Sequence, residues 1–231
     1  MPLRSLETHA PLPGVSLGDI GPKLGFNSID NGWCRFDEVR VPRDHLLGGV
    51  AKVTPQGGYE RVQGGEKRMY GAMLDVRANI VSKAAVALAK ASVIACRYST
   101  VRQQGYDAAS SSASKPLREV AVIEHATQAV GVLPWLAMAY GLHFTGTRFR
   151  KQYTAFLQHD PQAPPLPMLH AESSGLKALL TQRVADGIEA LRKLCGGHGY
   201  SALSGLPELS NNYLALATLE GTQQVDWSDG V

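Results

Sequence analysis

The sequence predicts a mainly α fold, in which a bundle of long helices follows a shorter β-rich segment. After residue 60, apolar residues recur in steps of three or four over long stretches, which is the helical period. Before residue 60, short apolar runs alternate with Gly and Pro, which leaves room only for strands and turns. With 44% hydrophobic and 19% charged residues among 231, the chain has a globular composition. We therefore expect a β segment over 1–60 and a helical bundle over 61–231.

The β segment is expected to hold a few short strands. Phe36, Val39 and Val41 are separated by charged residues, a broken alternation that predicts one or two half-buried strands. Three or four short strands make a poor independent domain, so the segment is read as part of a larger sheet.

The first predicted helix extends from about residue 66 to 103 and stops at Gly105. The low-complexity stretch AASSSASK at 108–115 then predicts a loop. The apolar face of this helix is expected to consist of Met69, Met73, Val76, Ile80, Ala84, Leu88, Ala91 and Ala95.

Two further helices complete the expected bundle. One follows Pro116 and continues to about Phe156, before four prolines between 161 and 167. The next begins near Leu169, and Gly196-Gly197 supply its C-terminal stop. Three antiparallel helices with loops between them form a bundle.

Composition excludes several classes of function. A net charge of +3, from 23 basic and 20 acidic residues, is too balanced for a general nucleic-acid binder. No run approaches 18 consecutive apolar residues and the start lacks a signal-peptide pattern, so neither a membrane span nor secretion is expected. Three scattered cysteines and isolated histidines offer neither a disulfide framework nor metal-ligand spacing, so we expect an intracellular protein without a metal.

The motif CGGHGYS at 195–201 closes the third predicted helix. A double glycine here is most often a helix cap, but glycine also serves where the backbone approaches a ligand closely. The motif alone leaves both interpretations of Gly196 and Gly197 open.

The motif YSTVRQQ at 98–104 places Arg102 at the end of the first predicted helix. A solvated cation is favourable there, whereas the functional alternative is a guanidinium aimed at a phosphate. Position alone favours the solvated cation. Between residues 60 and 102, however, eight basic residues stand against three acidic ones, so a phosphate-bearing small ligand stays open.

The motif LEGTQQV at 219–225 places one carboxylate, Glu220, between an apolar stretch and a glycine. Most isolated glutamates are surface charges. A carboxylate held in an apolar pocket is instead a usable base for a weakly acidic C–H, provided that a donor polarises the adjacent carbonyl. Spacing alone does not decide between the two.

Together and in this order, the motifs resemble those of the peroxisomal acyl-CoA oxidases, relatives of the acyl-CoA dehydrogenases. The resemblance extends over nearly the whole chain. Besides CGGHGYSALSGLP at 195–207, it is carried by LRSLETHAPLPGVSLGDIGPKLGF (3–26), DNGWCRFDEVRVPRDHLL (30–47), GAMLDVRANIV (71–81), ACRYSTVRQQ (95–104), LPWLAMAYGLHFTG (133–146) and LHAESSGLKAL (169–179).

This resemblance implies an FAD enzyme that oxidises a fatty acyl-CoA to the trans-2-enoyl-CoA and passes the electrons to oxygen, giving hydrogen peroxide. It also implies a long-helix bundle preceded by a partial β-barrel segment. Residues 1–60 would be the C-terminal part of the family's middle β domain, and 61–231 the helical domain that carries the catalytic glutamate. A homodimer in the peroxisome is implied as well.

By position in the motif, Glu220 would remove the α-proton of the substrate while the β-hydrogen leaves as hydride. The resemblance implies two donors to the thioester carbonyl, the backbone N–H of this glutamate and a ribityl hydroxyl of FAD, which stabilise the enolate-like charge. Gly221 would lie against the substrate.

The resemblance also implies a set of FAD-binding residues. Arg102 would contact the pyrophosphate or adenine end of FAD across a subunit boundary. Gly196 and Gly197 would allow close backbone approach to the cofactor, and Thr222 and Gln224 would lie near it.

Two features keep alternatives open. Gln103 stands where oxidases commonly have a second arginine, and GTQQV resembles the dehydrogenases, so an acyl-CoA dehydrogenase is one alternative. Met1 falls inside what would be the middle β domain, so the β segment with the flavin-ring contacts is absent from this sequence. The other alternative is therefore an inactive, truncated helical fragment that packs or dimerises without chemistry.

Overall fold

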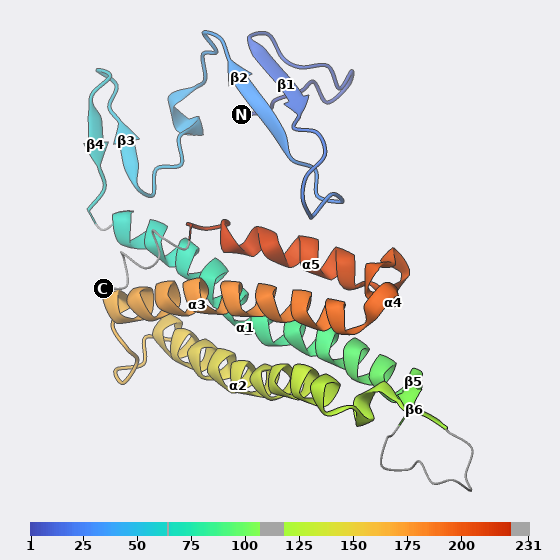
Figure 1. The fold of residues 1–231 in the computed structure, drawn as a ribbon. Coiled ribbons are helices and arrows are strands. Elements are labelled where there is room, and N and C mark those ends of the chain that lie inside the picture. The colour runs from blue at the N-terminus through green and yellow to red at the C-terminus, as the bar shows by residue number, and fades with distance from the viewer. Residues whose placement is uncertain (64, 107–117, 223–231) are drawn as a thin grey trace, which may run out of the picture. The chain divides into compact units, whose positions relative to one another are not determined.

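The computed structural model describes residues 1–63, 65–106 and 118–222. The chain divides into two compact units, Met1–Met73 and Leu74–Val231. Helices dominate the second unit and short strands the first, so the predicted mainly α fold is confirmed (Figure 1).

The first unit contains two antiparallel strand pairs. Strand β1 (Val15–Asp19) pairs with β2 (Gly32–Phe36), and β3 (Ala51–Val53) pairs with β4 (Tyr59–Arg61). A short 3-10 turn, η1 (Arg43–His45), lies between the pairs in the sequence. Of the apolar side chains, only those of Val15 and Ala51 are buried among the described residues of this unit, as expected of part of a larger sheet.

The predicted strand over Val39 and Val41 is wrong. Strand β2 ends at Phe36, and the chain then turns through Glu38, whose φ of 49° lies in the left-handed region. Pro42 follows and has no N–H to donate to a ladder. The apolar alternation therefore continues past the point where the backbone leaves the extended conformation.

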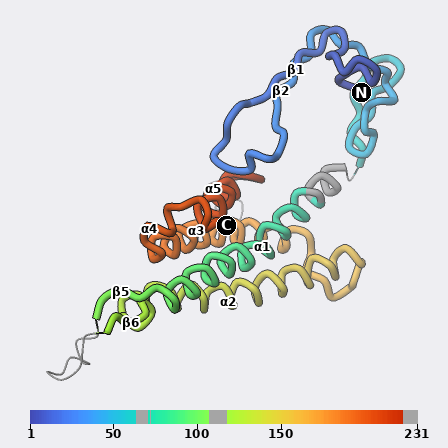
Figure 2. Tube along the Cα trace, turned by 90° about the vertical axis from the view of Figure 1, so that its right-hand side faces the viewer, coloured from blue at the N-terminus to red at the C-terminus, as the bar shows by residue number. Residues whose placement is uncertain are grey.

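The second unit is an up-and-down bundle. It consists of most of α1 (Gly65–Val101), with α2 (Ala126–Leu157), α3 (Leu166–Leu194), the short α4 (Gly196–Tyr200) and α5 (Leu206–Leu214). The three long helices alternate in direction, and α5 returns along α3 (Figure 1). Figure 2 shows α1 and α2 running side by side from a second direction.

Small and aliphatic residues form the core of the bundle. Leu88 of α1, Phe149 of α2 and Ile188 of α3 are fully buried in one continuous cluster. Each such side chain contributes about 1.5–3 kcal/mol to the free energy of unfolding. At Gly146 of α2, a Cβ would lie 3.0 Å from Cα of Ser82 on α1, so glycine permits the close approach of these helices.

Helix α1 has the composition of a core helix. Its stretch Met73–Val101 is long and apolar enough to cross a membrane. An 18-residue window within it has a mean hydropathy of 1.4, yet half of that window is buried within the protein. It also contains Arg77, which is only 2% exposed. A long helix packed on several sides by other helices requires this apolar character.

Helix α1 fits the expected range closely, but α2 begins ten residues later than predicted from Pro116. Residues before it form β6 (Glu119–Ala121), which pairs with β5 (Gln103–Tyr106), and the 3-10 turn η3 (Val122–Glu124). Pairing with β5 supplies backbone hydrogen bonds to residues of β6. The helical period of the sequence continues through these residues, although they do not form a helix. The loop predicted at 108–115 lies outside the described residues.

Helix α5 is absent from the sequence prediction. It starts from Gly205, which adopts a left-handed φ of 72°, and has a proline in its first turn. A stretch of nine residues offers too few repeats for the helical period to stand out.

Candidate active site

The segment after α5 places Glu220 at the surface of the bundle. Buried Tyr213 anchors α5, and the 3-10 turn η5 (Ala215–Ala217) follows. Thr218 and Leu219 each donate a backbone N–H to the carbonyl of Ala215, at 3.2 and 3.1 Å. The chain then leaves the helical conformation at Glu220, whose side chain is exposed.

The backbone at Glu220 and Gly221 is unusual. Glu220 has a φ of 57°, and Gly221 has a φ of 110°. The first value is in the left-handed region that few residues other than glycine adopt, and the second is accessible in practice only to glycine. Such backbone is concentrated at functional sites, where the surrounding structure holds it in place.

Two buried cations donate to the carbonyl oxygens of this segment. Nη2 of Arg77 on α1 lies 3.1 Å from the carbonyl oxygen of Glu220, and Nζ of Lys177 on α3 donates to that of Gly221. Arg77 is 2% exposed and Lys177 is fully buried. Nη1 of Arg77 also donates to Oγ of Ser174 on α3, at 2.5 Å. The segment is therefore tied to both α1 and α3.

Arg102 lies elsewhere, at the C-terminal end of α1. Its exposed side chain lines a hollow of about 460 Å³ together with Tyr98, Val101, Gln103 and His198. The rings of Tyr98 and His198 lie 5.4 Å apart between centroids. The hollow thus combines a guanidinium with an amide and two rings, which are the groups that bind phosphate and stack on a flat heterocycle.

The glycine turn of α4 forms the other side of this region. Gly196 has a left-handed φ of 55°, and a Cβ built there would lie 3.9 Å from the hydroxyl of Tyr98. At Gly197 a Cβ would meet no atom within 4 Å in the described part of the chain. The glycine turn therefore lies beside the hollow that Arg102 lines, through Tyr98 and His198.

Gln128 holds this end of the bundle together. Its side-chain amide nitrogen donates to Oγ of Ser99 on α1, at 2.8 Å, and to the carbonyl of Leu194 on α3, at 3.0 Å. A half-buried side chain of α2 thus fixes the end of α1 against the start of the glycine turn.

The two regions lie far apart within one chain. Arg77, beside the Glu220 segment, and Arg102 are 25 positions apart in the sequence. At 1.5 Å per residue, this corresponds to about 37 Å along the helix. Figure 1 shows the end of α5 and the glycine turn at opposite ends of the bundle.

The remaining predicted residues lie at or beyond the Glu220 segment. Thr222 is exposed, and Gln224 lies outside the described residues. Within the described ranges, no cluster of three His, Cys, Asp or Glu side chains could hold a metal ion.

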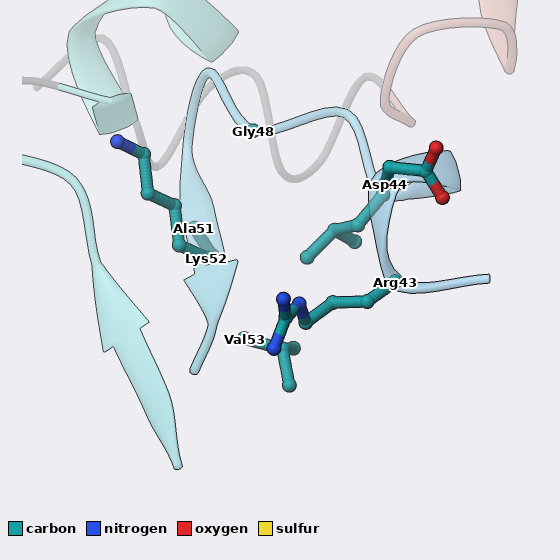
Figure 3. A pocket seen from close by; sticks show the side chains of 7 residues that line it. Arg43, Asp44, Gly48, Ala51, Lys52 and Val53 are labelled. Carbon is teal, nitrogen blue, oxygen red and sulfur yellow. The ribbon is translucent and has the colours of Figure 1, made fainter. Parts of the chain in front are cut away.

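The first unit has a hollow of its own, of about 380 Å³ (Figure 3). It is lined by side chains of both charges, including Arg43, Asp44 and Lys52, and by apolar residues such as Val53. None of the residues predicted to bind or react lies in this unit.

Sequence reasoning missed Arg77 and Lys177. Both occur inside motifs that carried the family resemblance, GAMLDVRANIV and LHAESSGLKAL. The available signal was a cation at a core position of a helix. Lys177 stands three residues before Leu180 and seven before Val184, both of which are buried.

Comparison with known proteins identifies the chain. Residues 70–227 match the model of the family described as "Acyl-CoA oxidase, C-alpha1 domain". The chain belongs to the acyl-CoA oxidase family. The peroxisomal acyl-coenzyme A oxidase 1 of Dictyostelium discoideum is 45% identical over 222 residues, which cover 95% of this chain and 31% of that protein.

Solved acyl-CoA oxidases share the fold. Arabidopsis thaliana acyl-CoA oxidase 1 matches with a TM-score of 0.87 and 44% identity, over 99% of this chain and 34% of that one. Acyl-CoA oxidase-2 of Caenorhabditis elegans, crystallised with FAD, ascaroside-CoA and ATP, matches with a TM-score of 0.85 and 35% identity, over 100% and 34%. The chain thus spans about a third of the length of the acyl-CoA oxidases it matches.

Proposed function

We propose that this chain is the part of an FAD-dependent acyl-CoA oxidase that carries the catalytic base. The overall reaction converts a fatty acyl-CoA and oxygen into the trans-2-enoyl-CoA and hydrogen peroxide. The observation that carries the proposal is the exposed carboxylate of Glu220 on a strained segment held by two buried cations. Membership of the acyl-CoA oxidase family supports the reaction class.

Glu220 accepts the α-proton of the substrate. The thioester makes this C–H weakly acidic, and a carboxylate close to it serves as general base. Gly221, next in the chain, carries no side chain and so leaves room for the acyl thioester beside the base. When bound, FAD supplies the acceptor for the β-hydride.

The hollow around Arg102 fits the nucleotide end of FAD. The guanidinium of Arg102 suits the pyrophosphate, and the rings of Tyr98 and His198 suit the adenine. Gly196 and Gly197 leave the backbone of the turn open to close approach, and Thr222 and Gln224 would hold the cofactor near Glu220.

Because Arg102 and Glu220 lie far apart in one chain, we place the two FAD-binding regions of each site on different subunits of a homodimer. An exposed apolar strip on α1 and α2, which includes Val86, Val93 and Tyr140, supports association. Light scattering at micromolar concentration checks this, since a strictly monomeric mass contradicts it.

The names of the relatives support a peroxisomal location. We further propose that residues 1–60 are the C-terminal part of the middle β domain and 61–231 the helical domain. Limited proteolysis checks this division, because cleavage should concentrate after β4, before α1, and release a stable helical fragment.

The decisive experiment is Glu220→Gln in a full-length protein that contains this chain. The amide keeps the shape of the side chain but lacks its basicity. We expect FAD binding to persist and anaerobic flavin reduction by acyl-CoA to fall by about 10²- to 10⁴-fold. Glu208→Gln is the comparison variant, because Glu208, an exposed glutamate of α5, is the next candidate for the base if Glu220→Gln has little effect. A loss below about tenfold for Glu220→Gln contradicts the proposal.

The same assays separate the alternatives. Transfer to an electron-transfer flavoprotein with little peroxide indicates an acyl-CoA dehydrogenase. If the chain is purified alone, remains colourless and cannot be reconstituted with FAD, it is a helical fragment without chemistry of its own.

A further inference from the structure

The segment 219–222 needs an external restraint to keep its shape. Glu220 adopts a left-handed φ, which is sterically unfavourable for a residue with a side chain, and the irregular backbone continues through Gly221. Neither residue is part of a helix or strand, so no ladder of backbone hydrogen bonds holds them. Among the described residues, side chains of the bundle donate hydrogen bonds to this segment.

Lys177 is placed to supply that restraint. Its side chain is fully buried, and Nζ donates to the carbonyl oxygen of Gly221. A buried ammonium is stable only with hydrogen-bond partners, and hydrogen bonds from charged donors are stronger than neutral ones. The carbonyl oxygen of Gly221 is therefore one of the groups that stabilise the buried ammonium, and the ammonium in turn holds this carbonyl.

Arg77 provides a second contact one residue earlier. Its guanidinium joins Ser174, one turn before Lys177 on α3, to the carbonyl of Glu220. Two successive carbonyl oxygens of the segment thus accept from two cations on two different helices. Because each peptide unit is planar and trans, the amide N–H groups of Gly221 and Thr222 then face away from these cations.

We propose that Lys177 is a positioning residue for Glu220. Lys177 fixes the peptide plane after Gly221, and Arg77 fixes the plane before it. Together they hold the backbone from which the carboxylate of Glu220 projects. The inference rests on the proposed function, in which Glu220 is the base. The conformation of the segment can be tested without cofactor or substrate.

The test substitutes Lys177→Met, which preserves length and apolar volume but removes the donor. Lys193→Met is the matched control on the same helix, because Lys193 is exposed and pairs with Glu189 at 3.4 Å. The first readout is amide hydrogen exchange of residues 219–222. The second is cleavage by a glutamate-specific protease after Glu220, compared with cleavage after exposed Glu7.

We expect Lys177→Met to raise both the exchange rate and the cleavage rate at Glu220 by about tenfold or more, which is the scale of one charge-assisted hydrogen bond. Cleavage after Glu7, exchange of the core helices and the melting temperature should stay close to those of the unmodified chain. A purely structural lysine would instead change the melting temperature and the exchange of the whole bundle.

In the FAD-loaded full-length enzyme, Lys177→Met should slow flavin reduction at saturating acyl-CoA while leaving the substrate dissociation constant within about threefold. If Glu220→Gln leaves that rate unchanged, the proposed base is wrong, but exchange and proteolysis still report on Lys177. The two failures are therefore distinguishable.

Local exchange and cleavage within twofold of the unmodified chain, in a folded Lys177→Met protein, overturn the proposal. If this variant does not fold, Lys177→Gln supplies the same readouts with a neutral donor, and an intermediate increase supports the proposal. If neither variant folds, Lys177 serves the core rather than the segment, and the proposal is also overturned.

Discussion

Gly199 offers a sharp test of the packing that supports the Arg102 hollow. A Cβ built at this position lies 1.9 Å from the carbonyl oxygen of Arg192 and 2.9 Å from its carbonyl carbon. Both atoms are backbone atoms of α3, so no flexible side chain can move aside. Gly199→Ala requires α4 to separate from the end of α3 by about 1.5 Å to reach ordinary contact distance.

The cost follows from this displacement. The shift breaks the hydrogen bond that the N–H of Gly199 donates to the carbonyl oxygen of Cys195, at 3.4 Å. Overpacking of this kind costs about 2–3 kcal/mol. For a protein of this size we expect the melting temperature to fall by about 4–12 °C. Urea denaturation followed by circular dichroism measures the free energy of unfolding directly.

Gly197→Ala is the matched control in the same turn. Its Cβ has open space within the described structure, and alanine favours a helical turn. Its stability should lie within about 0.5 kcal/mol of the unmodified chain, or slightly above it. If Gly199→Ala is equally harmless, or if the two variants are equally destabilised, the reasoning from close packing is refuted.

Three further predictions concern the bundle. Burial raises the pKa of the Tyr213 hydroxyl, so the folded state keeps a proton that the unfolded state releases above pH 10. The free energy of unfolding should therefore fall above pH 10, by about 1.4 kcal/mol per pH unit. This loss should be absent in Tyr213→Phe when unfolding is compared at pH 9 and 11. Phe149→Ala should cost about 3–5 kcal/mol in urea unfolding, because Phe149 is fully buried, whereas Phe144→Ala, at a side chain that is 68% exposed, should cost under about 0.5 kcal/mol. The hydrogen bond from Arg192 lowers the pKa of Glu189, so its stabilisation is present above the unfolded pKa near 4.5 and lost as pH falls below it; Glu189→Gln should flatten the acid branch of a stability curve by less than about 1 kcal/mol, given its exposure.

The long helices were predictable because they repeat their pattern many times. Helix α1 was expected over 66–103 and extends over Gly65–Val101, since the apolar repeat continues through many turns. The expected apolar face was partly wrong, because Val76 is 39% exposed and Leu74 and Ala78 are buried instead. The elements that the sequence did not predict are short. The pairing of β5 with β6 joins two short segments on either side of residues 107–118, and neither carries a strand pattern strong enough to reveal its partner.

The sequence alone proposed only the exposed residues of the candidate site. Glu220, Arg102 and the glycine turn stand in motifs whose order resembles a family, and in the structure the turn lies beside the hollow that Arg102 lines. The buried half was missed because periodicity assigns core positions to apolar residues. Arg77 and Lys177 occupy such positions, and only the fold shows which carbonyl oxygens they meet.

The length of α1 sets the distance between Arg77, which is buried within the helix, and Arg102, which directly follows its last residue, Val101. The two arginines are 25 positions apart in the sequence. Inserting or deleting a single residue between them rotates one arginine by about 100° relative to the other. The intervening residues can therefore exchange freely as long as they fill the core, whereas their number is fixed, and α1 should accept substitutions far more readily than changes in length.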